Sequence, residues 1–375
     1  MNGNNNIRVG TIFGIPFFVN PSWFLILGLV TWTYGNDLAQ DFPTLLPGVP
    51  LALGLVTGLL LFSSVVAHEL GHSWVAIKQG IPVRSITLFL FGGVASIEKE
   101  PTTPGNAFWV SIAGPLVSFL LCGLLVVFNI FAVLPAPLMA ISTVLAIINF
   151  SLGVFNLIPG LPLDGGNILK AIVWKITGNP YQGVKVASWT GQAFGALAIL
   201  SGLIPLLNGN PNRLWNILVG WFLIQNARSA GQFARVQSRL DGLVVIDAVS
   251  ANSPIVSADA SLRDFVDLRT LQPGNWRKFL VVDAASKLVG EVTVDVLQNI
   301  PSELWSGKKV GAVMEPIEPT TTIEAGSSLM AAIEQLEKYR FSELTVIQAD
   351  GSLVGLVEKV SIIDLIQQRS DAISV

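Results

Sequence analysis

Long apolar segments with very few charges occupy the first 240 residues of this 375-residue chain. Only 6 of its 25 acidic residues lie there. A helix of about 20 apolar residues crosses a bilayer, and hydrocarbon requires every backbone polar group to be paired. We therefore predict a multi-pass integral membrane protein. Its six spanning helices lie near residues 21–34, 50–77, 107–131, 138–157, 184–207 and 214–224, of which the first and last need flanking residues to span fully.

The loops between these segments carry their positive charge mainly on one side. Loops on that side hold 10 lysine and arginine residues, whereas those on the other side hold only Arg213. Because basic residues are enriched in cytoplasmic loops, we predict that both termini face the cytoplasm. The acidic part of the chain, residues 241–375, would then be cytoplasmic as well, since it holds the remaining 19 acidic residues against 11 basic ones.

Both histidines of the chain lie in one pentapeptide of the second span, His68-Glu69-Leu70-Gly71-His72. Histidines four apart on a helix share a face and can bind one metal ion, and the intervening glutamate can act as a general base. The pattern is short and also occurs by chance in soluble helices. Ionisable groups are costly inside a membrane, however, so this position favours a functional site.

A third metal ligand is predicted from topology. The second and fourth spans run in the same direction, so Asp164, just after the fourth, should lie at the depth of His68 and His72. It is the only acidic residue between Glu100 and Asp241. A catalytic zinc needs three protein ligands and an open position, which these three residues can supply. The alternative is that Asp164 only caps the following helix.

The two motifs together resemble the site-2 proteases, a family of intramembrane zinc metalloproteases. The family pattern is HExxH followed by Asn-x-x-Pro-x-x-Pro-x-Asp-Gly, and its fixed positions match His68, Glu69, His72, Asn156, Pro159, Pro162, Asp164 and Gly165. The resemblance implies a six-helix protease core with one zinc ion per chain, held by the two histidines and Asp164, with Glu69 as the base. It also implies that Asn156 contacts or orients a membrane-spanning protein substrate, such as an anti-sigma factor or a membrane-tethered regulator, with Pro159 beside it.

Residues 88–98 combine apolar residues with a Gly92-Gly93 turn signal, which predicts a short membrane-associated β-hairpin. In the site-2 protease family a strand-like element here lies beside the active site. We expect it to pair with an unwound substrate backbone by strand addition. The alternative is a hairpin that only covers the end of the helix. Residues 112–115, with small side chains, are assigned to helix packing.

Residues 244–370 contain a weak internal repeat of about 65 residues, which resembles a tandem pair of CBS domains. Such pairs often bind adenine nucleotides through a Gly-x-x-Thr-x-x-Asp pattern. The first copy has Gly290 and Thr293 but Val296 at the last position, with Asp295 one place early. The second has Gly355 followed by Glu358 and Ser361. Adenine-nucleotide binding and a homodimer formed through these domains both stay open, beside a plain docking module.

The predicted fold is therefore a membrane all-α protease core at residues 1–230, a linker at 231–243, and a soluble α/β module of CBS domains at 244–306 and 307–370. The predicted function is intramembrane zinc proteolysis, regulated by the CBS module. One alternative is a CBS-regulated transporter or channel, although its pore would usually spread polar groups along several spans. Another is a zinc protease acting on lipidated or signal peptides. No basic patch predicts nucleic-acid binding.

Overall fold

The computed structural model describes residues 6–89, 92–209, 213–250, 253–271 and 278–373. It divides into two compact units, which we call the N-terminal unit (Met1–Arg235) and the C-terminal unit (Val236–Val375). The division falls inside one long helix, α7, which runs from Leu214 to Leu240 and so covers most of the segment predicted as a linker.

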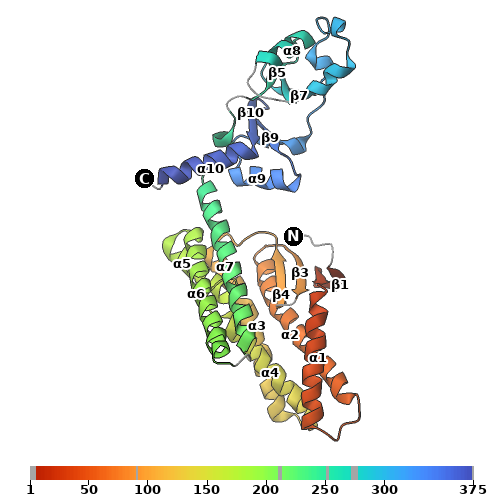
Figure 1. Cartoon of the computed structure of the whole chain (residues 1–375), viewed down its shortest axis with the longest axis vertical. Helices are drawn as coiled ribbons and strands as arrows, with labels where there is room; N and C mark the ends of the chain where they lie inside the picture. Colours follow the sequence, from red (N-terminus) through yellow and green to blue (C-terminus); the bar gives the residue numbers. More distant parts are fainter. Residues whose placement is uncertain (1–5, 90–91, 210–212, 251–252, 272–277, 374–375) are drawn as a thin grey trace. The chain divides into compact units, whose positions relative to one another are not determined.

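The N-terminal unit is a bundle of long helices (Figure 1). The helices before α7 are α1 (Ser22–Asp41), α2 (Val49–Lys78), α3 (Pro104–Phe131), α4 (Ala136–Asn156), α5 (Asp164–Thr177) and α6 (Pro180–Leu207). Among the described residues, α2, α3, α4 and α6 are long and apolar enough to cross a membrane. Each of the six predicted spans lies on a helix, and α5 is an additional helix that was not predicted as a separate element.

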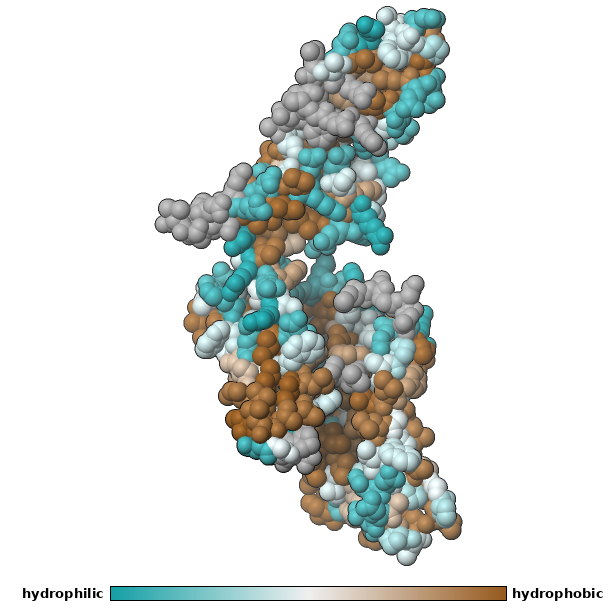
Figure 2. All heavy atoms as spheres, in the orientation of Figure 1, coloured by the Kyte–Doolittle hydropathy of each residue, from teal (hydrophilic) through white to brown (hydrophobic). Residues whose placement is uncertain are grey.

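The outer faces of these helices are strongly apolar. Large hydrophobic side chains such as Leu120, Leu124 and Phe131 on α3 are more than half exposed. Figure 2 shows apolar side chains gathered over the helices of the N-terminal unit. In water such a surface would favour aggregation, whereas lipid tails are as apolar as the side chains themselves. The helices are therefore built for a hydrocarbon environment.

A four-stranded sheet lies against one end of this bundle. Its strands are β1 (Ile7–Ile12), β2 (Ile15–Val19), β3 (Val83–Phe89) and β4 (Gly92–Ile97), in that spatial order. The predicted hairpin at 88–98 is the antiparallel pair β3–β4. Gly92 and Gly93, which were expected to form its turn, instead belong to β4, where they pair with Phe89 and Leu88, and residues 90–91 lie outside the described part. The strands β1 and β2 were not predicted. Ile86 and Leu88 of β3 pack with Phe62 of α2, which fixes the sheet onto that helix.

The C-terminal unit contains the same arrangement twice. The first copy comprises β5 (Ile255–Ser257), α8 (Leu262–Leu271), β6 (Lys278–Val282) and β7 (Leu288–Thr293). The second comprises β8 (Thr322–Glu324), α9 (Leu329–Lys338), β9 (Glu343–Ile347), β10 (Leu353–Glu358) and α10 (Lys359–Ile373). Each copy forms a three-stranded sheet, with one parallel and one antiparallel pair, over its own apolar core. The weak sequence repeat is therefore a structural repeat.

Candidate metal centre and active site

Three side chains converge in the N-terminal unit. His68 Nε2 lies 3.1 Å from Asp164 Oδ2 and 3.3 Å from His72 Nε2, and His72 Nε2 lies 3.3 Å from the same carboxylate oxygen. Ligand atoms about 2.0–2.1 Å from a tetrahedral zinc ion are separated by about 3.4 Å. The three atoms therefore have the spacing that one metal ion requires, with a fourth position left for water or substrate.

The second ring nitrogen of His72 shows which way its lone pair points. His72 Nδ1 lies 2.7 Å from the backbone carbonyl oxygen of Val110, which can only accept a hydrogen bond. Nδ1 must therefore carry the hydrogen, and in a neutral imidazole this leaves a lone pair on Nε2. His68 Nδ1 lies 2.9 Å from the hydroxyl oxygen of Ser118. Two imidazole nitrogens and a carboxylate oxygen form a donor set that suits zinc.

Helix α3 supplies the surface against which both imidazoles rest. Val110, Gly114 and Ser118 are spaced four residues apart and so share one face. A Cβ added to Gly114 would overlap His72 Nε2 and lie 2.7 Å from His68 Nε2. Gly114 does serve packing, as expected for residues 112–115, but the groups packed against it are the two histidines. Val110 and Ser118 were not predicted, and their only sequence signal is this spacing.

The segment between α4 and α5 carries Asp164 back to the histidines. A Cβ added to Gly160 would lie 2.6 Å from Gly191 Cα on α6, so the segment packs backbone against backbone. The N-cap of α5 is Leu163, which makes no side-chain cap hydrogen bond, and Asp164 is the first residue of the helix. Its carboxylate is directed to His68 and His72 instead. This observation favours the ligand interpretation over the capping alternative.

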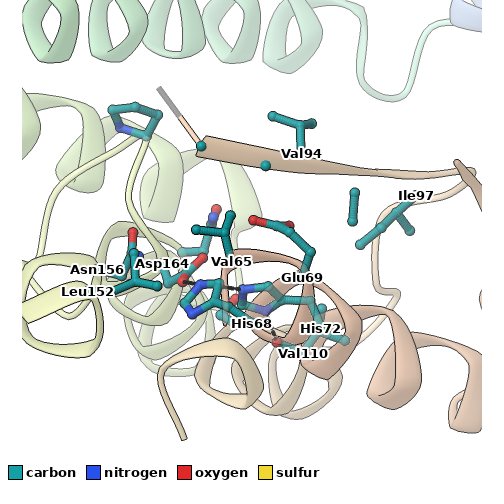
Figure 3. A pocket seen from close by; sticks show the side chains of 16 residues that line it. Val65, His68, Glu69, His72, Val94, Ile97, Val110, Leu152, Asn156 and Asp164 are labelled. Carbon is teal, nitrogen blue, oxygen red and sulfur yellow. Dashed lines mark hydrogen bonds and ion pairs between the residues drawn. The ribbon is translucent and has the colours of Figure 1, made fainter. Parts of the chain in front are cut away.

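The three converging residues open onto a cavity of about 320 Å³ (Figure 3). Glu69, Asn156, Gly92 and Gly93 also line it, whereas Pro159 is not among the lining residues that the structure describes. Asn167 of α5 lines it too and was not predicted.

Glu69 extends from α2 toward β4 on one side of the cavity (Figure 3). A Cβ added to Gly93 would lie 2.6 Å from Glu69 Cγ, so β4 passes directly over this glutamate. The site thus places a candidate base between three candidate metal ligands and a strand.

Comparisons with known proteins show to which family the chain is similar. Residues 56–137 and 132–199 match the model of peptidase family M50, and residues 310–368 match the CBS domain model. The chain is 51% identical to the zinc metalloprotease sll0528 of Synechocystis sp., over 97% of this chain and 96% of that protein. It is 28% identical to the zinc metalloprotease MJ0392 of Methanocaldococcus jannaschii, over 96% of each chain. The solved site-2 protease from the same archaeon is 32% identical, with a TM-score of 0.44, over 60% of this chain and 95% of that one.

Fold, site and relatives together define a membrane-embedded zinc metalloprotease with a C-terminal CBS module. The chain belongs to peptidase family M50, the site-2 protease family. The resemblance inferred from the two motifs and from the repeat is confirmed, as is zinc as the cofactor. An enzyme of this family is favoured over the transporter or channel alternative.

Proposed function

We propose that the protein cleaves membrane-spanning segments of tethered protein substrates, with zinc held by His68, His72 and Asp164 and with Glu69 as the general base. The observation that carries this proposal is the convergence of three ligand atoms beside Glu69, in a cavity covered by an edge strand. We further propose six spans with both termini in the cytoplasm, because 10 of the 11 basic residues among the first 240 lie on one side of the predicted bundle.

The reaction follows from the placement of Glu69. When bound, zinc activates water and polarises the carbonyl of the scissile peptide. The Glu69 carboxylate takes a proton from the attacking water and delivers it to the leaving amine nitrogen. His68, His72 and Asp164 stay fixed during these transfers because α2, α3 and the segment before α5 hold them. Preorganised groups of this kind cost no rearrangement at the moment of reaction.

The substrate would reach this site as an extended strand. A helical peptide bond is shielded by its own turn, so the segment must unwind before attack. Strand β4 pairs with β3 on one side, and among the described residues no strand pairs with its other edge. A substrate strand added there would satisfy its own backbone groups and pass close to Glu69, because Gly93 lies against that residue. Val94 is 51% exposed and would meet substrate side chains.

Asn156 contributes from another wall of the cavity. It is the last residue of α4, eight residues before Asp164, and it lines the same space as the histidines. Its amide can accept and donate hydrogen bonds, so we assign it to the orientation of the substrate backbone. Pro159 follows in the segment between α4 and α5, where it cannot continue the helix, and we assign it a supporting role for the turn toward Asp164.

We also propose that the C-terminal unit regulates the protease through an adenine nucleotide and pairs two chains. Support comes from the match of residues 310–368 to the CBS domain model and from the structural repeat within the C-terminal unit. In the second copy, Ser361 Oγ lies 2.8 Å and Glu358 Oε2 lies 3.4 Å from Ser250 Oγ, so the positions of the family pattern already contact this serine. The first copy retains Thr293, which makes it the favoured nucleotide half-site.

A comparison of wild type with Glu69→Gln tests the central proposal. Both proteins are purified as full chains, zinc is measured by atomic emission, and cleavage of a model membrane-spanning substrate is assayed. We expect about one zinc per chain in both and cleavage by wild type alone, because the amide cannot take up the proton. Glu98→Gln, at an exposed carboxylate paired with Arg84, is the matched control and should cleave normally. Equal cleavage by Glu69→Gln would refute the mechanism.

A further inference from the structure

We propose that Ser118 is a positioning residue for the metal centre, whose hydroxyl oxygen accepts a hydrogen bond from His68 Nδ1–H and so keeps the His68 Nε2 lone pair directed at the metal. The proposal rests on the assignment of His68, His72 and Asp164 as the zinc ligands. Neither of the two motifs includes this serine, which lies in the apolar interior of α3.

The contact is short and fully enclosed. Ser118 has 0% of its surface exposed and His68 has 3%, and the distance from Ser118 Oγ to His68 Nδ1 is 2.9 Å. A neutral imidazole carries one N–H, so a hydrogen on Nδ1 leaves Nε2 free to bind a metal, whereas a hydrogen on Nε2 blocks it. When zinc is bound to Nε2, Nδ1 carries the hydrogen, and the hydroxyl oxygen of Ser118 is the acceptor beside it that holds the ring in this orientation.

Ser118 differs from three other serines of α2 and α3. Ser111 on α3 and Ser63 and Ser73 on α2 each donate to a backbone carbonyl four residues earlier, at 2.8–2.9 Å. Such local bonds are the usual way in which a helix accommodates a serine in hydrocarbon. The hydroxyl of Ser118 instead lies against a side chain of α2, 50 residues away in the sequence. Its position is therefore explained by His68 rather than by the helix that carries it.

The two histidines are held by different kinds of partner. His72 Nδ1 contacts the carbonyl oxygen of Val110, a backbone atom that no substitution at that position removes. His68 Nδ1 contacts a side-chain hydroxyl, which a single substitution does remove. Partners of metal-bound histidines typically change metal affinity by about 10–100-fold when they are lost. Ser118 is thus the point at which this second layer of contacts can be tested.

The test measures zinc affinity of the full chain in detergent micelles, by competition with a chromophoric chelator. Ser118→Ala should raise the zinc Kd by about 10–100-fold, and Ser118→Thr, which keeps the hydroxyl, should restore it to within about threefold of wild type. The matched control is Ser142→Ala on α4. Ser142 is also buried, at 6% exposed, and its hydroxyl has no hydrogen-bond partner among the described residues, so zinc affinity should not change.

Two further readouts separate positioning from general damage. The visible absorption bands of the cobalt-substituted protein should shift in Ser118→Ala, because the geometry at His68 changes, and should be unaltered in Ser142→Ala. Thermal unfolding of the metal-free proteins should be similar for all variants. A Ser118→Ala Kd within twofold of wild type would overturn the proposal, as would a Ser118→Thr Kd as weak as that of Ser118→Ala.

His68→Ala distinguishes failure of this proposal from failure of the proposed function. If His68→Ala still binds zinc with the affinity of wild type, the ligand assignment is wrong and the role of Ser118 falls with it. If His68→Ala loses zinc while Ser118→Ala retains the affinity of wild type, the ligand assignment stands and only the positioning role is refuted.

Discussion

Several of the most deeply buried side chains of the N-terminal unit are polar, whereas the most deeply buried side chains of the C-terminal unit are apolar. Ser73, Ser118 and Asn149 are fully buried in the N-terminal unit, together with the two histidines at 3% and 8% exposed. In the C-terminal unit the fully buried residues include Phe265 and Phe279, and Thr345 is the one buried polar residue among those described there.

The difference reflects the solvent of each unit. Apolar side chains gain nothing by leaving lipid, so helices in hydrocarbon associate through small residues, close packing and hydrogen bonds. In water the removal of apolar surface is the main favourable contribution to folding. A buried polar group in the N-terminal unit therefore points to function or helix association. A buried apolar group in the C-terminal unit points to stability.

The largest expected effect is at the third ligand. Asp164→Ala removes one of three predicted zinc ligands, and we expect loss of both zinc and cleavage because two imidazoles alone bind the ion far more weakly. Metal content after dialysis and substrate cleavage are the measurements. Asp37→Ala, at an exposed aspartate of α1, is the control and should keep its zinc. If Asp164→Ala kept a full complement of zinc, the assignment of Asp164 as a zinc ligand would be wrong, and so would the functional interpretation of this polar group in the N-terminal unit.

The next effect separates two glycines of the same helix. Gly114→Ala places a methyl group against both imidazoles, so we expect zinc affinity to fall by at least tenfold. Gly123→Ala is the matched control, since nothing lies within 4 Å of an added Cβ there. Alanine is favoured over glycine in a helix by roughly 1 kcal/mol, so this variant should be as stable as wild type or more so. Equal zinc affinity in the two variants would contradict the role given to Gly114.

The corresponding test in the C-terminal unit concerns its core. Phe279→Ala removes a fully buried ring that packs edge-on against Phe265 at 4.9 Å between centroids. A loss of about 3–5 kcal/mol in unfolding free energy is expected for this unit. Hydrogen exchange of the full chain in urea, followed by mass spectrometry, measures it peptide by peptide. Zinc content should not change, and Leu304→Ala, at a 56% exposed position, should have little effect on either quantity.

The smallest effect depends on pH. Burial raises the pKa of Glu343, the carboxylates of Glu358 and Glu291 raise it further, and Lys278 lowers it. With a raised pKa in the folded state, the stabilising contribution of Glu343 is complete below its unfolded pKa of about 4.3 and is lost as pH rises through the folded value.

Glu343→Gln should therefore stabilise the C-terminal unit at pH 7 and leave its stability unchanged near pH 4. The same hydrogen-exchange experiment at the two pH values measures this. Glu334→Gln, at an exposed position of α9, should show no such difference. Stabilisation that is equal at both pH values would mean that the amide acts through packing rather than through charge.

The central features of the fold and site were predictable because they rest on strong sequence signals. The helical spans follow from the length of the apolar segments, and the convergence of His68, His72 and Asp164 follows from topology and from the scarcity of acidic residues. The CBS copies follow from a repeat, although their poor match to the nucleotide pattern left the ligand open. These signals can be read from the sequence alone because each depends on the type of residue or on the spacing at which similar residues recur.

Other features depend on contacts that have no pattern along the chain. Val110 acts through a backbone carbonyl, which every residue carries, and Ser118 is one of several serines in apolar helices. The strand β1 is largely exposed, so it lacks the alternation of buried and exposed residues that marks a strand against a core. Helix α5 begins with Asp164 and two glycines, which are typical of turns rather than of helices.

The close approach of the segment that carries Asp164 to α6 limits the substitutions that this part of the enzyme can tolerate. Gly160 lies against Gly191 there, and a larger residue at either position would force the backbone of the segment that carries Asp164 to shift. On strand β4, the side chain of Val94 is 51% exposed and points away from His68, His72 and Asp164 (Figure 3). If substrates pair with β4 as proposed, substitutions along this strand would alter substrate preference without altering the separations among His68, His72 and Asp164.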